Sequence, residues 1–240
     1  MASLTPAESS TGSSTGARSL QELASALSQL DYTFDEPRLE LEQYHTPPDV
    51  AARFLWTIRD DIVGKECADL GCGQGILGIG ASILGASRVV GFDVDPAAAA
   101  KAEANASSFG DMDVVLCDVK KGMSASHHLQ FDTVLTNPPF GTKSKKADIK
   151  FLSTALKLAR RAVYSLHKST TQEYLLARAA KWGLQGTIIA EINYPLPRTY
   201  ALHRKEEVEV KVCLLRLIKP EAVMEAERLA NPNAMPRNGL

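Results

Sequence analysis

One pattern limits the fold more than any other: after Lys65, short apolar segments alternate with segments of helical periodicity. Such alternation is typical of a parallel sheet whose strands are joined by helices. The last two strands follow each other closely, which indicates an antiparallel end. The sequence therefore predicts an α/β fold with a Rossmann-like, seven-stranded, mainly parallel sheet and helices on both faces. The expected strands are residues 66–70, 88–93, 112–117, 131–136, 163–166, 187–194 and 208–218, and the expected helices between them are residues 76–84, 96–107, 148–161 and 171–182.

Two further helices are expected before this pattern. Leucines recur at helical spacing from residue 20 to residue 30, and Ser19 is a suitable N-cap for that helix. A second helix follows Pro47 and Pro48, with Asp49 as its expected cap. The flanking segments are polar and poor in apolar residues. The expected organisation is a disordered tail at residues 1–18, a globular domain at residues 19–218 and a C-terminal tail at residues 219–240.

The composition excludes several classes of protein. Hydrophobic residues make up 45% of the chain and charged residues 23%, which is usual for a globular domain. No apolar run approaches the roughly 20 residues of a membrane span, so no membrane association is expected. The four cysteines form no C-x-x-C pair, which favours reduced thiols, no metal site, and a cytosolic or nuclear compartment. They are Cys67, Cys72, Cys117 and Cys213.

Charge is distributed unevenly along the chain. Residues 141–168 contain eight Lys and Arg residues against Asp148, a local charge of +7, although the whole chain has a net charge of -1. The remainder therefore carries -8. A basic face on an acidic body is the pattern expected for local contact with nucleic acid.

A glycine-rich turn follows the first predicted strand, in the sequence Asp-Leu-Gly-Cys-Gly-Gln-Gly at residues 69–75. Gly71 and Gly73 allow a ligand to lie against the backbone. The spacing differs from the dinucleotide pattern G-x-G-x-x-G, which argues against a nicotinamide oxidoreductase. Asp69 ahead of the turn favours a zwitterionic ligand with a cationic amine over a pyrophosphate.

Two more acidic residues follow the next two strands. Asp93 ends the second strand, where a carboxylate can bind both hydroxyls of a ribose. Asp118 ends the third, where it can accept from an adenine amino group while the Val119 amide donates to the ring. Asp95 is interpreted as the cap of the following helix. Acids at three successive strand ends predict a nucleoside-containing cofactor.

The sequence Asn-Pro-Pro-Phe directly follows the fourth strand. The side-chain oxygen of Asn137 and the carbonyl of Pro138 can both accept from one planar amino group. Those contacts would localise the nitrogen lone pair for attack on a sulfonium methyl group. Pro139 stiffens the turn, and Phe140 can stack on the target's flat face. These four residues are the predicted catalytic residues of an amino-nitrogen methyltransferase.

These motifs resemble those of the eukaryotic and archaeal methyltransferase-like enzymes that form N6-methyladenosine in small-subunit ribosomal RNA. The similarity covers residues 20–217 and is carried by the segments at residues 41–46, 69–75, 91–93, 137–143 and 162–169. It implies a class I methyltransferase fold, S-adenosylmethionine as cofactor and RNA as substrate. The cofactor-binding residues expected from the motifs and the resemblance are Gln43, Thr46, Asp69, Gly71, Gly73, Gln74, Asp93, Asp118 and Val119.

The resemblance also implies a small zinc-binding activator subunit and a nuclear (nucleolar) and cytoplasmic location. Residues 112–117 are consistent with such a partner, because an apolar edge strand invites pairing with another chain. Two departures from the family pattern lie beside the cofactor: Gln74 stands where Cys is common, and Pro47-Pro48 is an unusual pair.

Three alternatives remain open from the sequence. A protein methyltransferase acting on a glutamine amide uses the same Asn-Pro-Pro signature, and so does a DNA adenine methyltransferase. An inactive, cofactor-binding scaffold for ribosome assembly belongs to a different class. The basic segment after Phe140 favours nucleic acid over a protein substrate, and the intact motif at residues 137–140 argues against a scaffold.

Overall fold

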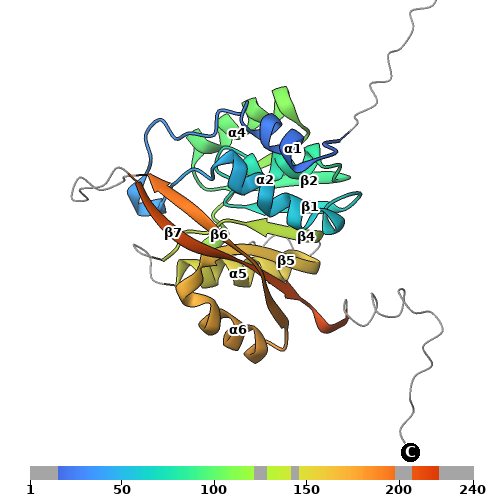
Figure 1. Cartoon of the computed structure of the whole chain (residues 1–240), viewed down its shortest axis with the longest axis vertical. Helices are drawn as coiled ribbons and strands as arrows, with labels where there is room; N and C mark the ends of the chain where they lie inside the picture. Colours follow the sequence, from blue (N-terminus) through green and yellow to red (C-terminus); the bar gives the residue numbers. More distant parts are fainter. Residues whose placement is uncertain (1–15, 122–128, 142–145, 198–206, 222–240) are drawn as a thin grey trace, which may run out of the picture.

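The computed structural model describes residues 16–121, 129–141, 146–197 and 207–221, which form a seven-stranded sheet between helices (Figure 1). The strand order is β3-β2-β1-β4-β5-β7-β6. The first five strands run parallel, and β7 inserts antiparallel between β5 and β6. The strands are β1 (Glu66–Leu70), β2 (Arg88–Asp93), β3 (Asp113–Leu116), β4 (Phe131–Thr136), β5 (Ala159–Lys168), β6 (Gln185–Pro197) and β7 (Glu207–Ile218).

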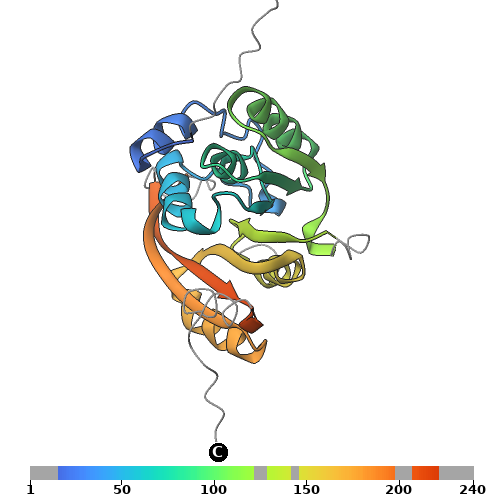
Figure 2. The same cartoon turned by 90° about the vertical axis from the view of Figure 1, so that its right-hand side faces the viewer.

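Helices cover both faces of the sheet, as predicted, and each face has its own apolar core. Helices α1 to α4 contribute to one core, while α5 and α6 contribute to the other. The long β6–β7 hairpin runs along one side of the molecule (Figure 2). The helices are α1 (Leu20–Leu27), α2 (Pro48–Thr57), α3 (Ile76–Ile83), α4 (Pro96–Phe109), α5 (Ala147–Leu158) and α6 (Gln172–Lys181).

The boundary between α5 and β5 differs from the prediction. The helix ends at Leu158 and not at residue 161, so Arg160 and Arg161 belong to the strand. Strand β5 pairs with β4 on one side and β7 on the other, and Ala159 is already in register with Phe131. Backbone pairing on both sides overrides the helical periodicity of this segment.

The helix caps were predicted with mixed success. The Ser19 hydroxyl accepts from the Glu22 amide at 3.1 Å, and Asp95 accepts from the Ala97 amide at 3.2 Å, which confirms both caps. The Asp49 cap is wrong, because α2 begins at Pro48 and its N-cap is Pro47. Proline fits a first helical turn without its N–H, so Asp49 falls inside that turn.

The predicted tails lie mostly outside the described residues, which exclude 1–15 and 222–240. Ala17 already belongs to the packed domain, because its amide donates to the Ile83 carbonyl at 3.3 Å. The four cysteines are free thiols. Over the described ranges no helix is both long and apolar enough to cross a membrane, and the same ranges hold no group of three or more potential metal ligands.

Candidate active site

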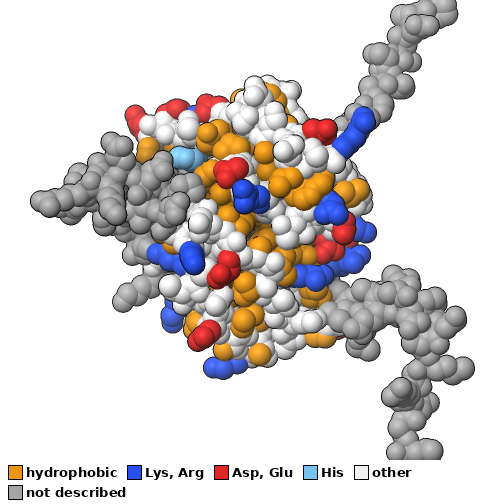
Figure 3. Space-filling model, viewed as in Figure 1, with side chains coloured by type: hydrophobic (Ala, Val, Ile, Leu, Met, Phe, Trp, Pro, Cys, Tyr) orange, Lys and Arg blue, Asp and Glu red, His pale blue; other side chains and the backbone are white. Residues whose placement is uncertain are grey.

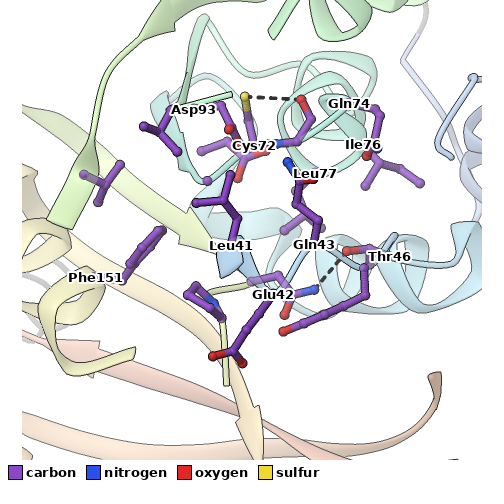
Figure 4. A pocket seen from close by; sticks show the side chains of 18 of the residues that line it. Leu41, Glu42, Gln43, Thr46, Cys72, Gln74, Ile76, Leu77, Asp93 and Phe151 are labelled. Carbon is purple, nitrogen blue, oxygen red and sulfur yellow. Dashed lines mark hydrogen bonds between the residues drawn. The ribbon is translucent and has the colours of Figure 1, made fainter. Parts of the chain in front are cut away.

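A cavity opens at the carboxyl ends of the parallel strands, where the fold predicts a ligand site. Its volume is about 820 Å³, counting the part open to solvent. Figure 4 shows Leu41, Glu42 and Gln43 approaching from the N-terminal segment, opposite the glycine turn. Every predicted site residue lines this cavity except Pro138 and Phe140.

The glycine turn forms the floor of the cavity. Gly71 has φ 70°, and a side-chain carbon there would lie 2.9 Å from the Phe151 ring, so both conformation and space require glycine. Below the turn, Asp69 is buried, and its Oδ2 accepts from the Gly78 amide at 2.9 Å. Its Oδ1 has no partner. Burial raises the pKa of Asp69 to about 7, although the Gly78 hydrogen bond opposes that shift.

Asp93 joins the loop after β1 to the loop after β2, beside the cavity. Its Oδ2 accepts from the Gly73 amide at 2.8 Å and its Oδ1 from the Asp95 amide at 2.9 Å. Burial raises the pKa of this carboxyl group. Asp95 caps α4 and also accepts from the Gln43 side chain at 2.7 Å. Gln43 is therefore tied to the end of β2, and the N-terminal segment is joined to the sheet.

The end of β3 supplies the third acidic position. Asp118 lines the cavity, and its carboxylate accepts from the Lys120 amide at 3.0 Å. Val119 is buried beside it. Gln74 is also buried, and its Nε2 has no hydrogen-bond partner.

Asn137 has a divided hydrogen-bonding pattern. Its Nδ2 donates to the Thr46 hydroxyl at 2.9 Å and to the Tyr194 hydroxyl at 3.1 Å. Its Oδ1 is buried and has no partner. Because Asn137 lines the cavity, this arrangement leaves one strong acceptor at the catalytic turn for an incoming donor.

The remainder of the Asn-Pro-Pro-Phe turn packs against the N-terminal segment. The Pro138 carbonyl, expected to accept from the target amino group, accepts from the Tyr44 hydroxyl at 2.9 Å, which leaves it one lone pair. Phe140 packs on Tyr44 with ring centroids 5.0 Å apart, and the Lys168 ammonium lies 5.7 Å from its ring centroid. Phe140 itself lies outside the cavity lining, between an aromatic and a cationic neighbour.

Several lining residues were missed by the sequence analysis, among them Phe34, Tyr44 and Phe151. The Tyr194 contact with Asn137 was also missed. Tyr44 lies within the segment at residues 41–46 that carries the family resemblance, and that signal could have identified it. Tyr194 gives no comparable signal, because 57 residues separate it from Asn137.

The basic segment at residues 141–168 does not form one face. Arg160 pairs with Glu66 at 2.6 Å and Arg161 with Asp61 at 4.0 Å, at the start of β5. Lys168 lies at the other end of that strand, beside Phe140. Lys143 and Lys145 lie outside the described residues. On the face shown in Figure 3, basic and acidic side chains are interspersed.

Strand order, glycine turn and catalytic turn together define a class I methyltransferase. The methyltransferase small domain family matches residues 45–169. The rRNA N(6)-adenosine-methyltransferase METTL5 of Danio rerio is 45% identical over 203 residues, covering 82% of this chain and 97% of that protein. Its Drosophila melanogaster counterpart is 40% identical over 75% of this chain and 87% of that protein. The crystal structure of PH1948 from Pyrococcus horikoshii superposes with a TM-score of 0.73 and 34% identity, covering 83% of this chain and 97% of that one.

The chain belongs to the family of rRNA N6-adenosine methyltransferases that includes METTL5. The predicted class I fold and the predicted family are thereby confirmed.

Proposed function

We infer that this chain transfers a methyl group from S-adenosylmethionine to N6 of an adenine in ribosomal RNA, in the small subunit. Family membership supports the reaction. The observation that carries the site assignment is Asn137: both of its amide protons are donated within the protein, while its buried Oδ1 has no partner. An adenine amino group would supply the hydrogen-bond donor that this oxygen lacks.

The cavity has the polar groups that the cofactor requires. Asp69 Oδ1 is an unpartnered acceptor suited to a cationic amine. Asp93 still has a lone pair for a ribose diol, because its two oxygens offer about four acceptor sites and the backbone amides of Gly73, Val94 and Asp95 occupy three at most. Asp118 and the Val119 amide would form hydrogen bonds with the adenine ring of the cofactor. Gln43, Thr46, Gly71, Gly73 and Gln74 would complete the binding site.

When bound, S-adenosylmethionine supplies an electrophilic methyl group. The protein's contribution is to position the acceptor nitrogen. Asn137 Oδ1 and the remaining lone pair of the Pro138 carbonyl would accept hydrogen bonds from the two N6–H groups and localise the nitrogen lone pair. Pro139 holds the turn rigid, and Phe140 would support the flat face of the base. No general base is assigned, because the proton can leave after the nitrogen has become cationic.

The reaction is tested by nucleoside mass spectrometry of small-subunit rRNA from cells that lack the protein. Loss of N6-methyladenosine, restored by wild-type protein, is expected. Asn137→Ala should restore none of it, yet retain cofactor affinity in calorimetry, because Asn137 contacts the acceptor. Equal loss of cofactor affinity and turnover in Asn137→Ala would make Asn137 a structural residue.

The same experiment separates the alternative activities. Unchanged rRNA together with a loss of methylated glutamine would favour a protein substrate, and a loss of methylated DNA adenine would favour DNA. Full restoration by Asn137→Ala would favour the inactive scaffold. None of these alternatives has an observation in the site that favours it over RNA.

We also propose that a small zinc-binding activator subunit pairs with β3. This strand lies at the edge of the sheet, and its Val115 and Leu116 side chains are 40% and 59% exposed. Soluble proteins usually protect such an edge with charge, proline or a bulge. Pairing there would extend the sheet without contacting the glycine turn. The proposed location is the nucleus, including the nucleolus, and the cytoplasm, where ribosomal RNA is made and used.

A further inference from the structure

The Asn137 side chain has two possible orientations, which differ by exchange of its oxygen and nitrogen. Only one of them directs the oxygen at a substrate amino group. In the structure the nitrogen faces Thr46 and Tyr194, and the oxygen is the atom without a partner. Some part of the surroundings must favour this orientation, because the two have nearly the same shape.

Tyr194 supplies that preference through its second hydrogen bond. Its hydroxyl donates to the His45 carbonyl at 3.1 Å. A carbonyl can only accept, so the single hydroxyl proton is committed to His45 and the Tyr194 oxygen can offer only lone pairs to Asn137. Tyr194 is fully buried, so water cannot supply another partner. Burial also raises the pKa of Tyr194 to about 12, and the hydroxyl therefore keeps its proton.

The reversed orientation would place the Asn137 oxygen against the Tyr194 oxygen with no proton between them. Thr46 cannot make the same distinction alone, because its hydroxyl can either donate or accept. We propose that Tyr194 is a positioning residue that fixes the Asn137 amide with its oxygen toward the target amino group. This role rests on the proposed function, and it acts through Asn137 without contact with the substrate.

The test removes only the hydroxyl of Tyr194. Tyr194→Phe keeps the ring and its edge-on contact with Tyr44, whose ring centroid lies 5.9 Å from that of Tyr194. We expect kcat to fall by about 10-fold or more, the effect of losing one oriented hydrogen bond. The cofactor Kd and the KM for RNA should stay within about twofold. Tyr164→Phe is the matched control, because it removes a buried hydroxyl that bonds to Asp61 outside the cavity. It should leave kcat unchanged.

A second readout is independent of catalysis. With 15N-labelled asparagine, the Asn137 side-chain amide protons should exchange slowly with solvent in the wild type, since both are hydrogen-bonded in a partly buried site. In Tyr194→Phe one of them should exchange faster. Unchanged exchange would overturn the inference. An inactive wild type on every adenine substrate would instead overturn the proposed function and leave this readout intact.

Asn137→Asp provides the sharpest comparison, because the two oxygens of a carboxylate are equivalent and cannot be wrongly oriented. Adding Tyr194→Phe to Asn137→Asp should cost no further kcat. If Tyr194→Phe lowers kcat equally in the wild type and in the Asn137→Asp variant, Tyr194 has a purely structural role. If Asn137→Asp is inactive, the amide exchange of Asn137 decides the question alone.

Discussion

The Tyr44 hydroxyl donates a 2.9 Å hydrogen bond to the Pro138 carbonyl, which joins the segment before α2 to the turn after β4. The ring of Tyr44 also packs on Phe140. One residue therefore holds both the carbonyl and the aromatic side chain of the catalytic turn. Burial raises the pKa of Tyr44 well above its usual value, so the hydroxyl remains a donor.

Tyr44→Phe should slow methyl transfer by roughly fivefold, because one neutral hydrogen bond contributes about 1 kcal/mol. Single-turnover kinetics with saturating RNA measures this step. Tyr44→Ala should be slower still, since it also removes the contact with Phe140. A faster Tyr44→Phe enzyme would mean that the Tyr44 hydroxyl competes with the substrate for the Pro138 carbonyl.

Asp93→Ala should weaken cofactor binding by about 2–3 kcal/mol, or roughly 30- to 200-fold. The variant loses the proposed ribose acceptor and also the two backbone amides that Asp93 holds in place. Calorimetry measures the affinity. Asp113→Ala removes an exposed carboxylate paired with Arg88 and serves as the control. Near-wild-type affinity in Asp93→Ala would remove Asp93 from the site.

Cofactor affinity should depend on pH through Asp69. Burial raises the pKa of this carboxyl group to about 7, and only its ionised form suits a cationic amine. Affinity should therefore rise about tenfold per pH unit well below pH 7 and level off near pH 8, where an α-amino group itself loses its proton. Calorimetry in two buffers of different ionisation enthalpy should detect proton release. Asp69→Asn should remove the pH dependence of cofactor affinity. Constant affinity of the wild type from pH 5.5 to 7.5 would contradict the role of Asp69.

The same shift affects the stability of the cofactor-free protein in the opposite sense. Burial raises the folded-state pKa of Asp69 above the ordinary value of an aspartate, so the folded state binds the proton more tightly than the unfolded chain. Its contribution to the free energy of unfolding is present below about pH 4 and is lost as the pH rises through about 7. Denaturant titrations of the wild type and Asp69→Asn should diverge over that range.

RNA affinity should depend on Lys168, which ends β5 beside Phe140, and on Lys146, which precedes the first residue of α5. Replacing Lys146 and Lys168 with Ala should reduce the log–log salt slope by about 0.7 for each phosphate interaction removed on single-stranded RNA. The control pair is Arg160→Ala with Arg161→Ala, which changes the charge equally. Arg160 lies about 26 Å from Lys168 along the strand and is paired with Glu66. Equal slopes for the two pairs of variants would refute a localised RNA contact.

The proposed partner is tested at the exposed edge of the sheet. Val115→Lys should prevent assembly with a co-expressed small zinc-binding activator subunit, because it introduces charge into an apolar seam. Val63→Lys changes a valine that is 53% exposed away from β3, and it should assemble normally. Size-exclusion chromatography reports the complex. A wild-type chain that is soluble, monomeric and fully active alone would rule out the partner.

Local patterns in the sequence predicted most of the sheet, including both bounds of β1, β2 and β4. The error at Arg160 and Arg161 arose because strand pairing with β4 and β7 is not visible in local periodicity. Strand β6 extends through Pro197, beyond its predicted end at residue 194. An edge strand tolerates proline, which made that boundary hard to place.

Most of the residues proposed to bind the cofactor could be expected at the cavity, because they lie at or just after the carboxyl ends of β1, β2 and β3, where the parallel topology gathers them. Gln43 and Thr46 precede the sheet and were expected from the family resemblance alone. The surroundings of Asn137 were not predictable. Tyr44 and Tyr194 lie 94 and 57 residues from their partners in the catalytic turn. A hydrogen bond over such a separation depends on the finished topology, and neither residue type nor spacing encodes it.

The position of β7 between β5 and β6 has a consequence for the order in which a growing chain becomes an enzyme. Strand β6 makes no ladder with β5, so Tyr194 cannot be held beside Asn137 until the later strand β7 has been synthesised and inserted. The residues proposed to bind the cofactor all precede residue 120 and can assemble earlier. During translation, competence to bind cofactor should therefore precede competence to methylate, and a nascent chain that ends before β7 should hold its cofactor without using it.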